Sequence, residues 1–150
     1  MSTVMTLAEL RNAEDVDLGA SSWVEITQER VDQFADATDD HQWIHVDPER
    51  AKDSPFGGTI AHGYLTLSLM PRFIHELLEI SDRGMGINYG IDKLRLTAPV
   101  PVGSRVRAHM RLAGSEDKAG GVLHRLEVQV EVEGQDKPAL VGTVLIIAMP

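Results

Sequence analysis

Apolar and polar positions alternate with a period of two through most of the second half of the chain. Residues 105–112 and 122–133 carry an aliphatic side chain at nearly every second position, mostly separated by arginine, histidine, glutamine or glutamate. This alternation is typical of strands with one face in the core and one in solvent. Residues 140–149 are apolar on both faces, which predicts a strand inside the sheet, and residues 91–96 alternate in part.

A period near 3.6 residues replaces this alternation in the first half of the chain. A helical stripe passes through Val31, Phe34, Ala35 and Thr38. It predicts a helix that Thr27 caps and that ends near Thr38. The segment from Tyr64 to Ile80 is apolar on most sides and predicts a long buried helix. Pro71 lies inside this segment, and because proline lacks an amide hydrogen we expect a bend there rather than a boundary.

Shorter elements precede the long helix. We expect a helix over Thr6–Ala13, capped by its threonine, and a first strand over Trp23–Ile26. A further helix is expected to begin at Pro48, because proline suits the first helical position. Residues 39–46 fit no period, and we expect no helix through the Trp43-Ile44 pair within them.

This order of elements predicts the fold class. Helices come first, and three or four long strands follow one another with short turns between them, which favours a meander of antiparallel strands. With 150 residues and no internal repeat or linker, residues 1–150 are expected to form a single domain. We therefore predict an α+β fold in which one antiparallel sheet wraps around a long central helix.

The composition argues against several classes of function. Lysine and arginine number 14 against 23 aspartates and glutamates, a net charge of −9, so we expect no binding to nucleic acid or to an anionic membrane. The chain has no cysteine, which excludes disulfides and thiolate chemistry and makes the cytoplasm the expected location. The first twenty residues lack the pattern of a secretory signal. No run approaches the ~18 apolar residues of a membrane span.

The densest polar chemistry lies between Asp36 and Gly63, directly before the apolar helix. This segment combines several carboxylates with His41, His45 and His62. A polar segment that leads into a buried helix is a typical place for an active-site loop.

A metal site is an alternative for this segment. Its candidate ligands are Asp39, Asp40, His41, His45 and Asp47. The spacing His41-x3-His45 suits zinc if the segment is helical. Because we expect no helix there and the chain has no thiolates, we predict no metal. Asp47 is better explained as a cap for the helix that begins at Pro48.

Two short motifs define the segment further. They are Asp40-x4-His45-Val46-Asp47-Pro48 and His62-Gly63. Together they resemble the hydratase signature of the MaoC-like family of (R)-specific enoyl-CoA hydratases and 3-hydroxyacyl-thioester dehydratases. The turn at residues 99–104 also resembles the family pattern. The similarity extends from about Trp23 onward and is greatest to single-domain members of actinobacterial type.

The resemblance implies the hotdog fold, in which a sheet wraps a central helix, in agreement with the fold predicted from the periodicity. It also implies a homodimer whose two sheets join edge to edge, with active sites near the subunit interface. The implied substrate is an acyl thioester of coenzyme A or of acyl carrier protein. No cofactor is expected, because coenzyme A is part of the substrate.

The resemblance also assigns roles in the reaction. Adding water to an unsaturated thioester needs a base for the water, an acid for the α-carbon and a donor to the enolate oxygen. By resemblance, Asp40 and His45 activate the water and exchange the acid and base roles. Gly63 donates its backbone N–H to the enolate oxygen, a role that suits the amide-rich, positive end of a helix.

Further residues are expected to contact the substrate: Gln42, Trp43, His62, Asn88, Tyr89 and Arg95. The chain departs from the family where Gln42-Trp43 replaces Asn-Pro, and where Pro71 replaces a polar residue that supports the catalytic pair. We expect Gln42 or Asn88 to supply that support. The basic strand positions Lys93, Arg95, Arg105, Arg107 and Arg111 either contact coenzyme A phosphates or form a solvated sheet face.

The sequence thus predicts reversible (R)-specific hydration of trans-2-enoyl-CoA to (R)-3-hydroxyacyl-CoA. Two alternatives stay open. A hotdog acyl-CoA thioesterase would also place a carboxylate near a helix N-terminus, although the Asp40–His45 pair favours hydration. A non-catalytic subunit that binds acyl thioesters would not need Asp40, His45 and Gly63 intact.

Overall fold

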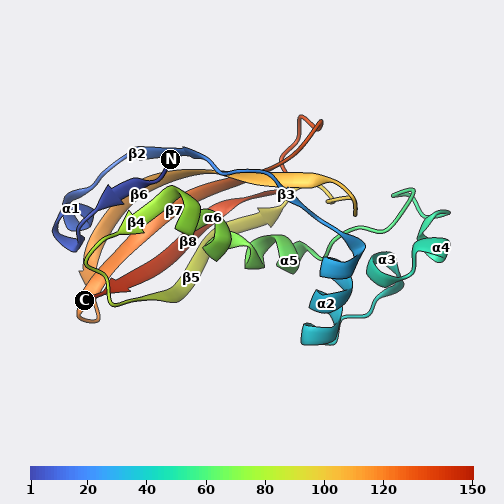
Figure 1. Cartoon of the computed structure of the whole chain (residues 1–150), viewed down its shortest axis with the longest axis horizontal. Coiled ribbons are helices and arrows are strands. Elements are labelled where there is room, and N and C mark those ends of the chain that lie inside the picture. The colour runs from blue at the N-terminus through green and yellow to red at the C-terminus, as the bar shows by residue number, and fades with distance from the viewer.

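The structure, a computed structural model, describes residues 1–150 and combines short helices with long strands (Figure 1). The helices are α1 (Leu7–Asn12), α2 (Gln28–Thr38), α3 (Trp43–Val46), α4 (Pro48–Ala51), α5 (Gly63–Ser68) and α6 (Met70–Leu77). The strands are β1 (Thr3–Met5), β2 (Val16–Ala20), β3 (Val24–Glu25), β4 (Leu78–Ile80), β5 (Met85–Leu96), β6 (Arg105–Lys118), β7 (Gly121–Val132) and β8 (Leu140–Met149). The long strands occupy the second half of the chain, as the alternation predicts.

One antiparallel sheet dominates the fold. Its strand order is β2-β6-β7-β8-β5, and β3 also pairs with β6. β6, β7 and β8 follow one another as a meander, while β5 pairs with β8. The apolar strand β8 therefore has a neighbour on each side, which confirms the interior position predicted for it. A separate two-stranded sheet pairs β1 with β4 in parallel.

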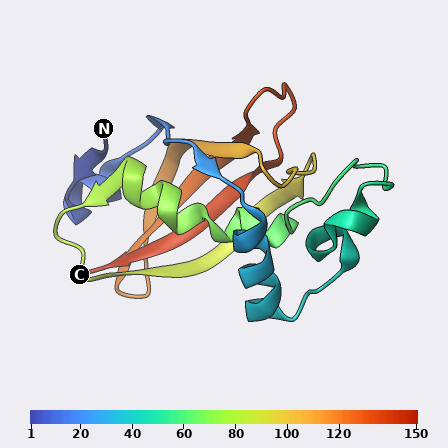
Figure 2. The ribbon, with the colours of Figure 1, turned by 45° about the vertical axis from the view of Figure 1, so that its right-hand side comes forward.

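A helical segment runs lengthwise across one face of this sheet (Figure 2). It consists of α5 and α6, separated at Leu69, so the prediction of one helix bent at Pro71 is wrong. Pro71 has no N–H to donate to the carbonyl of Leu67. α5 instead ends in a tighter turn, in which the N–H of Leu69 donates to the carbonyl of Thr66 (3.3 Å).

The helical segment also ends earlier than predicted. α6 stops at Leu77, and Leu78–Ile80 is the strand β4 rather than a last helical turn. The N-terminal strand β1 pairs with these three residues, with Met5 opposite Ile80. Hydrogen bonding to a distant strand therefore overrides the local helical pattern.

The hydrophobic core lies between the helical segment and the inner face of the sheet. Phe73 of α6 is fully buried, and Ile74 and Leu77 pack beside it. The sheet contributes the inward side chains of the alternating strands, among them Val106, Ala108, Leu112, Leu126, Val130 and Val132. Burying an aliphatic or phenyl side chain of this size contributes roughly 1.5–3 kcal/mol.

The outer face of the sheet is charged where β6 pairs with β7, and it also carries a small apolar cluster of Leu123, Leu145 and Ile147. Its ion pairs are Arg105 with Glu133, Arg107 with Glu131 (2.8 Å) and Arg111 with Asp15 (2.7 Å). The hydrogen bond from Arg105 lowers the pKa of Glu133, and hydrogen bonds from His109 and Arg107 lower the pKa of Glu131. For these three arginines the structure supports a solvated sheet face, because a partner on the chain already holds each guanidinium.

The N-terminal elements agree only in part with the sequence. Thr6 caps α1 in a reciprocal capping box with Glu9, and Thr27 caps α2, as predicted. The strand predicted over Trp23–Ile26 is shorter, since β3 holds two residues, and β2 was not predicted. None of the helices combines the length and the apolar character needed to cross a membrane.

Candidate active site

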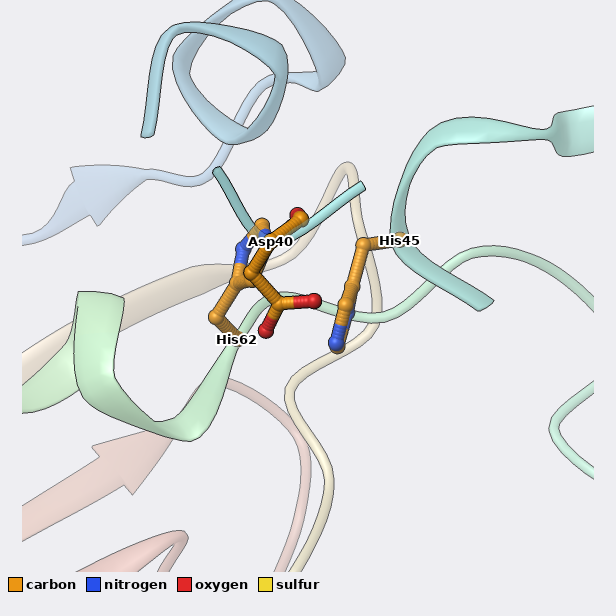
Figure 3. Close-up of side chains that lie close together, drawn as sticks. All are labelled: Asp40, His45 and His62. Atoms are coloured by element: carbon orange, nitrogen blue, oxygen red, sulfur yellow. The ribbon is translucent and has the colours of Figure 1, made fainter. Parts of the chain in front are cut away.

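Three side chains from separate parts of the chain meet beside the first turn of α5 (Figure 3). Asp40, His45 and His62 each offer a side-chain atom, and these atoms all lie within 4.8 Å of one another. Asp40 follows α2, His45 lies in α3 and His62 directly precedes α5. Asp39 ends α2 in the left-handed conformation (φ 62°), which turns the chain sharply before Asp40. The two halves of the motif are therefore one constellation in space.

His45 lies on a single helical turn, α3, although we expected no helix through Trp43 and Ile44. That prediction is wrong, and its cause is a long-range contact. A four-residue helix has too few hydrogen bonds to be stable by itself. The N–H of Ile60 donates to the carbonyl of Ile44 (3.0 Å) and helps to hold the turn against the segment before α5.

A backbone carbonyl sets the tautomer of His45. Nδ1 of the imidazole lies 2.6 Å from the carbonyl oxygen of Ile60. Because a carbonyl can only accept, Nδ1 carries the proton and donates it. Nε2 of neutral His45 is therefore unprotonated and available as a base.

Burial keeps the imidazole of His45 neutral. The side chain is buried, and this desolvation is the main reason why its pKa lies below the ordinary value. The hydrogen bond to Ile60 acts in the opposite direction, the neighbouring His62 lowers the pKa further, and the Asp40 carboxylate raises it. The net lowering favours the form that accepts a proton near neutral pH.

His62 is packed between the other site residues. Its ring stacks on the ring of His45 with a centroid distance of 3.9 Å, and the centroid of the Phe34 ring lies 4.9 Å from that of the His62 ring. Nε2 of His62 donates to the backbone carbonyl of Asp40 (2.9 Å), while its buried Nδ1 has no hydrogen-bond partner. His62 thus ties the Asp40 loop to the start of α5.

The stacked rings bear on the metal alternative. A metal ion binds imidazole nitrogen in the plane of the ring. The rings of His45 and His62 are tilted by only 24°, so their planes do not meet near the nitrogens. His41 lies elsewhere, hydrogen-bonded to Asp36 (2.9 Å) at the surface. Asp40, His45 and His62 could share an ion only if one ring rotated.

Gly63 begins α5 with a free amide. Its N–H makes no hydrogen bond within the chain, as expected for the first turn of a helix. A Cβ at this position would lie 2.2 Å from Cδ1 of Leu96, so glycine lets this side chain approach the helix start.

Two cavities meet at these residues. One, of about 400 Å³, is lined by Asp40, His45, His62, Gly63 and four neighbours. The other, of about 190 Å³, is lined mostly by apolar side chains near Thr66 and by the turn at residues 98–100. His45, Gly63 and Leu96 line both. A ligand that extends through both would pass between His45 and the Gly63 amide.

Two residues predicted to contact the substrate, Gln42 and Trp43, lie close to His45 in the sequence. The backbone N–H of Gln42 donates to Oδ1 of Asp40 (3.4 Å), whereas the side chain of Gln42 makes no hydrogen bond. Trp43 lines neither cavity and lies under the guanidinium of Arg50 at 4.3 Å.

The predicted strand residues lie away from the pair. Asn88 and Tyr89 line a separate cavity of about 450 Å³ with Leu67 and Pro71. Arg95 is exposed and donates to the neighbouring carbonyl of Leu94 (2.8 Å). Neither Gln42 nor Asn88 gives the pair the side-chain support that we expected.

Sequence reasoning missed the residues that provide this support. The carbonyl of Ile60 holds His45, and the side chains of Phe34 and Leu96 complete the cavity wall. Phe34 belongs to the predicted helical stripe, but the helical period shows only that Phe34 lies on the apolar face of the helix, not what this face contacts. A backbone carbonyl has no side-chain signature, so no pattern could have identified Ile60.

Comparisons with known proteins identify the family of the chain. Residues 9–134 match the family model described as MaoC like domain. 3-Hydroxyacyl-thioester dehydratase Z of Mycobacterium tuberculosis is 53% identical over 143 residues, which cover 95% of each chain. Nodulation protein N of Rhizobium leguminosarum bv. viciae is 45% identical over 139 residues, covering 91% of this chain and 86% of the relative.

A solved structure supports the fold independently. An unliganded (R)-hydratase from Pseudomonas aeruginosa matches with a TM-score of 0.76 at 24% sequence identity, covering 96% of this chain and 85% of that chain. This likeness confirms the predicted sheet wrapped around a helix. The chain therefore has the hotdog fold and belongs to the MaoC-like family of hydratases and dehydratases, enzymes of the hydro-lyase class.

Proposed function

We propose that this protein catalyses the reversible, (R)-specific hydration of trans-2-enoyl thioesters to (R)-3-hydroxyacyl thioesters. One observation carries the proposal: the side chains of His45 and Asp40 lie close together in a cavity that also holds the free amide of Gly63. The bond from Nδ1 of His45 to the carbonyl of Ile60 leaves Nε2 as the nitrogen that can act as base. The name of the M. tuberculosis relative, 3-hydroxyacyl-thioester dehydratase, describes the reverse direction of the same reaction.

His45 and Asp40 activate the water in this mechanism. The water oxygen attacks the β-carbon of the substrate while one of its protons moves to Nε2 of His45. The carboxylate of Asp40 accepts a hydrogen bond from the other O–H and orients the water. It also stabilises the imidazolium, since the charge of Asp40 raises the pKa of His45.

Gly63 stabilises the charge that this attack creates. The electron pair of the double bond moves toward the thioester and leaves negative charge on its oxygen. The Gly63 N–H, at the positive end of α5, donates to that oxygen. The proton on Nε2 then passes to the α-carbon. This transfer completes the addition of one water molecule and returns His45 to its neutral form.

The substrate supplies everything else that the reaction requires. The acyl group arrives as a thioester of coenzyme A or of acyl carrier protein, so coenzyme A is part of the substrate. In this proposal no step uses a metal or a separate cofactor. The reaction requires no partner of another class, and we place it in the cytoplasm.

A second copy of the chain is the proposed partner. β5 is an edge strand with no neighbour on its outer side. Its exposed apolar side chains are Met85, Ile87, Tyr89, Ile91 and Leu96. Such an edge favours pairing with another strand. We propose a homodimer in which two β5 strands meet, which also brings Leu96 of the cavity wall near the interface.

The test follows the conjugated absorbance of a trans-2-enoyl-CoA, with free thiol measured in parallel. Wild type should lose the conjugated signal without releasing thiol, and Asp40→Asn should lower the rate by about 10²–10⁴. Asp53→Asn, an exposed carboxylate outside the cavity, is the matched control and should leave the rate unchanged. Thiol release would identify a thioesterase instead. If neither the enoyl-CoA nor the enoyl thioester of acyl carrier protein reacts, this result would favour a binding subunit.

A further inference from the structure

A side chain outside both motifs holds the backbone of His45. Nε2 of Gln28, in the first turn of α2, donates to the carbonyl oxygen of His45 (2.7 Å) and to Oδ1 of Asp32 (2.9 Å). Oε1 of Gln28 accepts from the hydroxyl of Thr59 (2.7 Å). A carbonyl and a carboxylate can only accept, so the amide nitrogen must face them. The orientation of the Gln28 amide is therefore fixed by its partners.

These bonds reach both sides of the catalytic imidazole. The carbonyl of His45 accepts no backbone hydrogen bond, so the bond from Gln28 is what satisfies it. Thr59 is buried and directly precedes Ile60, whose carbonyl holds Nδ1 of His45. Gln28 thus joins the turn that carries the imidazole to the segment that orients it.

Gln28 does so without lining either cavity at the site. Its side chain is half-buried between α2, α3 and the Thr59–Ile60 segment. The charged or titratable groups nearest to His45 are Asp40 and His62, and Gln28 bonds to neither of their side chains. An effect of Gln28 on the reaction would therefore pass through the position of His45.

We propose that Gln28 is a positioning residue for the hydration reaction: it fixes the distance and angle between the imidazole of His45 and Asp40. This inference rests on the proposed function. Because α3 has only four residues, losing this bond would let the turn shift, and a misplacement of about 1 Å at a catalytic group can cost about 10²-fold in rate.

The variant Gln28→Met tests the inference, because methionine has a similar length and shape but none of the three hydrogen bonds. We expect kcat to fall by about 10- to 100-fold, while KM changes by no more than about twofold because the cavity lining is intact. The acid side of the pH profile should move toward higher pH, since a looser turn lets water reach His45 and returns its pKa toward the ordinary value.

Two further variants provide the controls. Gln33→Met makes the same substitution on the exposed side of α2, where the glutamine has no side-chain hydrogen bond, and should leave kcat and Tm unchanged. Thr59→Val removes only the hydroxyl that orients Gln28 and should produce a smaller loss of kcat. The double variant Gln28→Met/Thr59→Val should be no worse than Gln28→Met alone, because both act through one network.

The experiment measures kcat, KM and Tm for each variant and titrates the His45 imidazole by NMR. The inference is supported if Gln28→Met loses kcat with KM retained and His45 titrates at higher pH. It is overturned if Gln28→Met matches Gln33→Met, or if its kcat per folded molecule is that of wild type. If Gln28→Met does not fold, Thr59→Val decides by the same criteria.

The titration also separates this inference from the proposed function. If wild type hydrates no enoyl thioester, the proposed function fails while the titration still tests Gln28. An unchanged His45 titration in Gln28→Met would then overturn the inference, and a shift to higher pH would support a positioning role in whatever chemistry the site performs.

Discussion

β7 and α3 keep their shapes in opposite ways. β7 has twelve residues, pairs with β6 and β8 along most of its length, and buries its inward side chains in the core. α3 has four residues and depends on single hydrogen bonds from Ile60 and Gln28. Losing one contact in β7 leaves many others, whereas losing one at α3 should displace His45, the proposed base. The fold should therefore tolerate changes better than the activity does.

The largest expected effect is on the activity side of this comparison. His45→Gln removes the base and should lower the hydration rate by about 10²–10⁴ with little change in Tm. His75→Gln, at an exposed histidine of α6, should leave both unchanged. Rates and thermal melts of the two variants provide the measurement. A rate for His45→Gln within about tenfold of wild type would remove His45 from the mechanism.

The converse variant is in the core. Phe73→Ala leaves a cavity under the fully buried face of α6 and should destabilise the protein by about 3–5 kcal/mol. Urea unfolding measures this loss, and the assay of the folded fraction should give a nearly normal kcat. A stability loss below about 1 kcal/mol would mean that the core repacks around the gap.

Gly63→Ala lies between these extremes. The new Cβ would meet Cδ1 of Leu96 at 2.2 Å, and because this atom is the far end of a side chain that can rotate away, the fold should survive. We expect the rate to fall by about tenfold, because either the methyl group or the displaced Leu96 crowds the oxyanion position. Adding Leu96→Ala should recover part of the loss. No recovery would show that the methyl group itself blocks the substrate.

The smallest effect is expected at α1, far from the site. Thr6→Ala removes the capping box with Glu9 and should cost about 1 kcal/mol. The kcat should not change, because α1 contacts β6 and β7 rather than the catalytic loop. Denaturant unfolding and the hydration assay test both halves, and a loss of kcat would show that the scaffold and the site are coupled.

The same contrast explains what the sequence could predict. The alternation in β7 follows from burial of every second side chain, so neighbouring residues are enough to predict the strand. The caps of α1 and α2 also depend only on neighbouring residues. α3 depends on Ile60 and Gln28, which are 15 and 17 residues away from His45. No local pattern encodes such contacts. The sequence did not predict β4 for the same reason, because its partner β1 lies far away in the sequence, at Thr3–Met5.

The two motifs predicted which polar groups of the candidate site lie close together. Asp40, His45, His62 and Gly63 come together as the two motifs implied. Asn88 and Tyr89 line a different cavity, because they belong to β5, whose first residues the partial alternation of residues 91–96 did not cover. Sequence patterns identified the chemical groups, and the folded chain determines which of them meet.

The protonation state of His45 is the property that decides whether this side chain can act as the base. In protein with ¹⁵N-labelled imidazoles, the signal of His45 can be assigned among the six histidines by its absence in His45→Gln. We predict that at pH 7 the proton resides on Nδ1 and Nε2 is unprotonated, and that the ring titrates below its ordinary pKa of 6.5 because it is buried. A proton on Nε2 at pH 7, or a pKa above 6.5, would contradict His45 as the base that activates water.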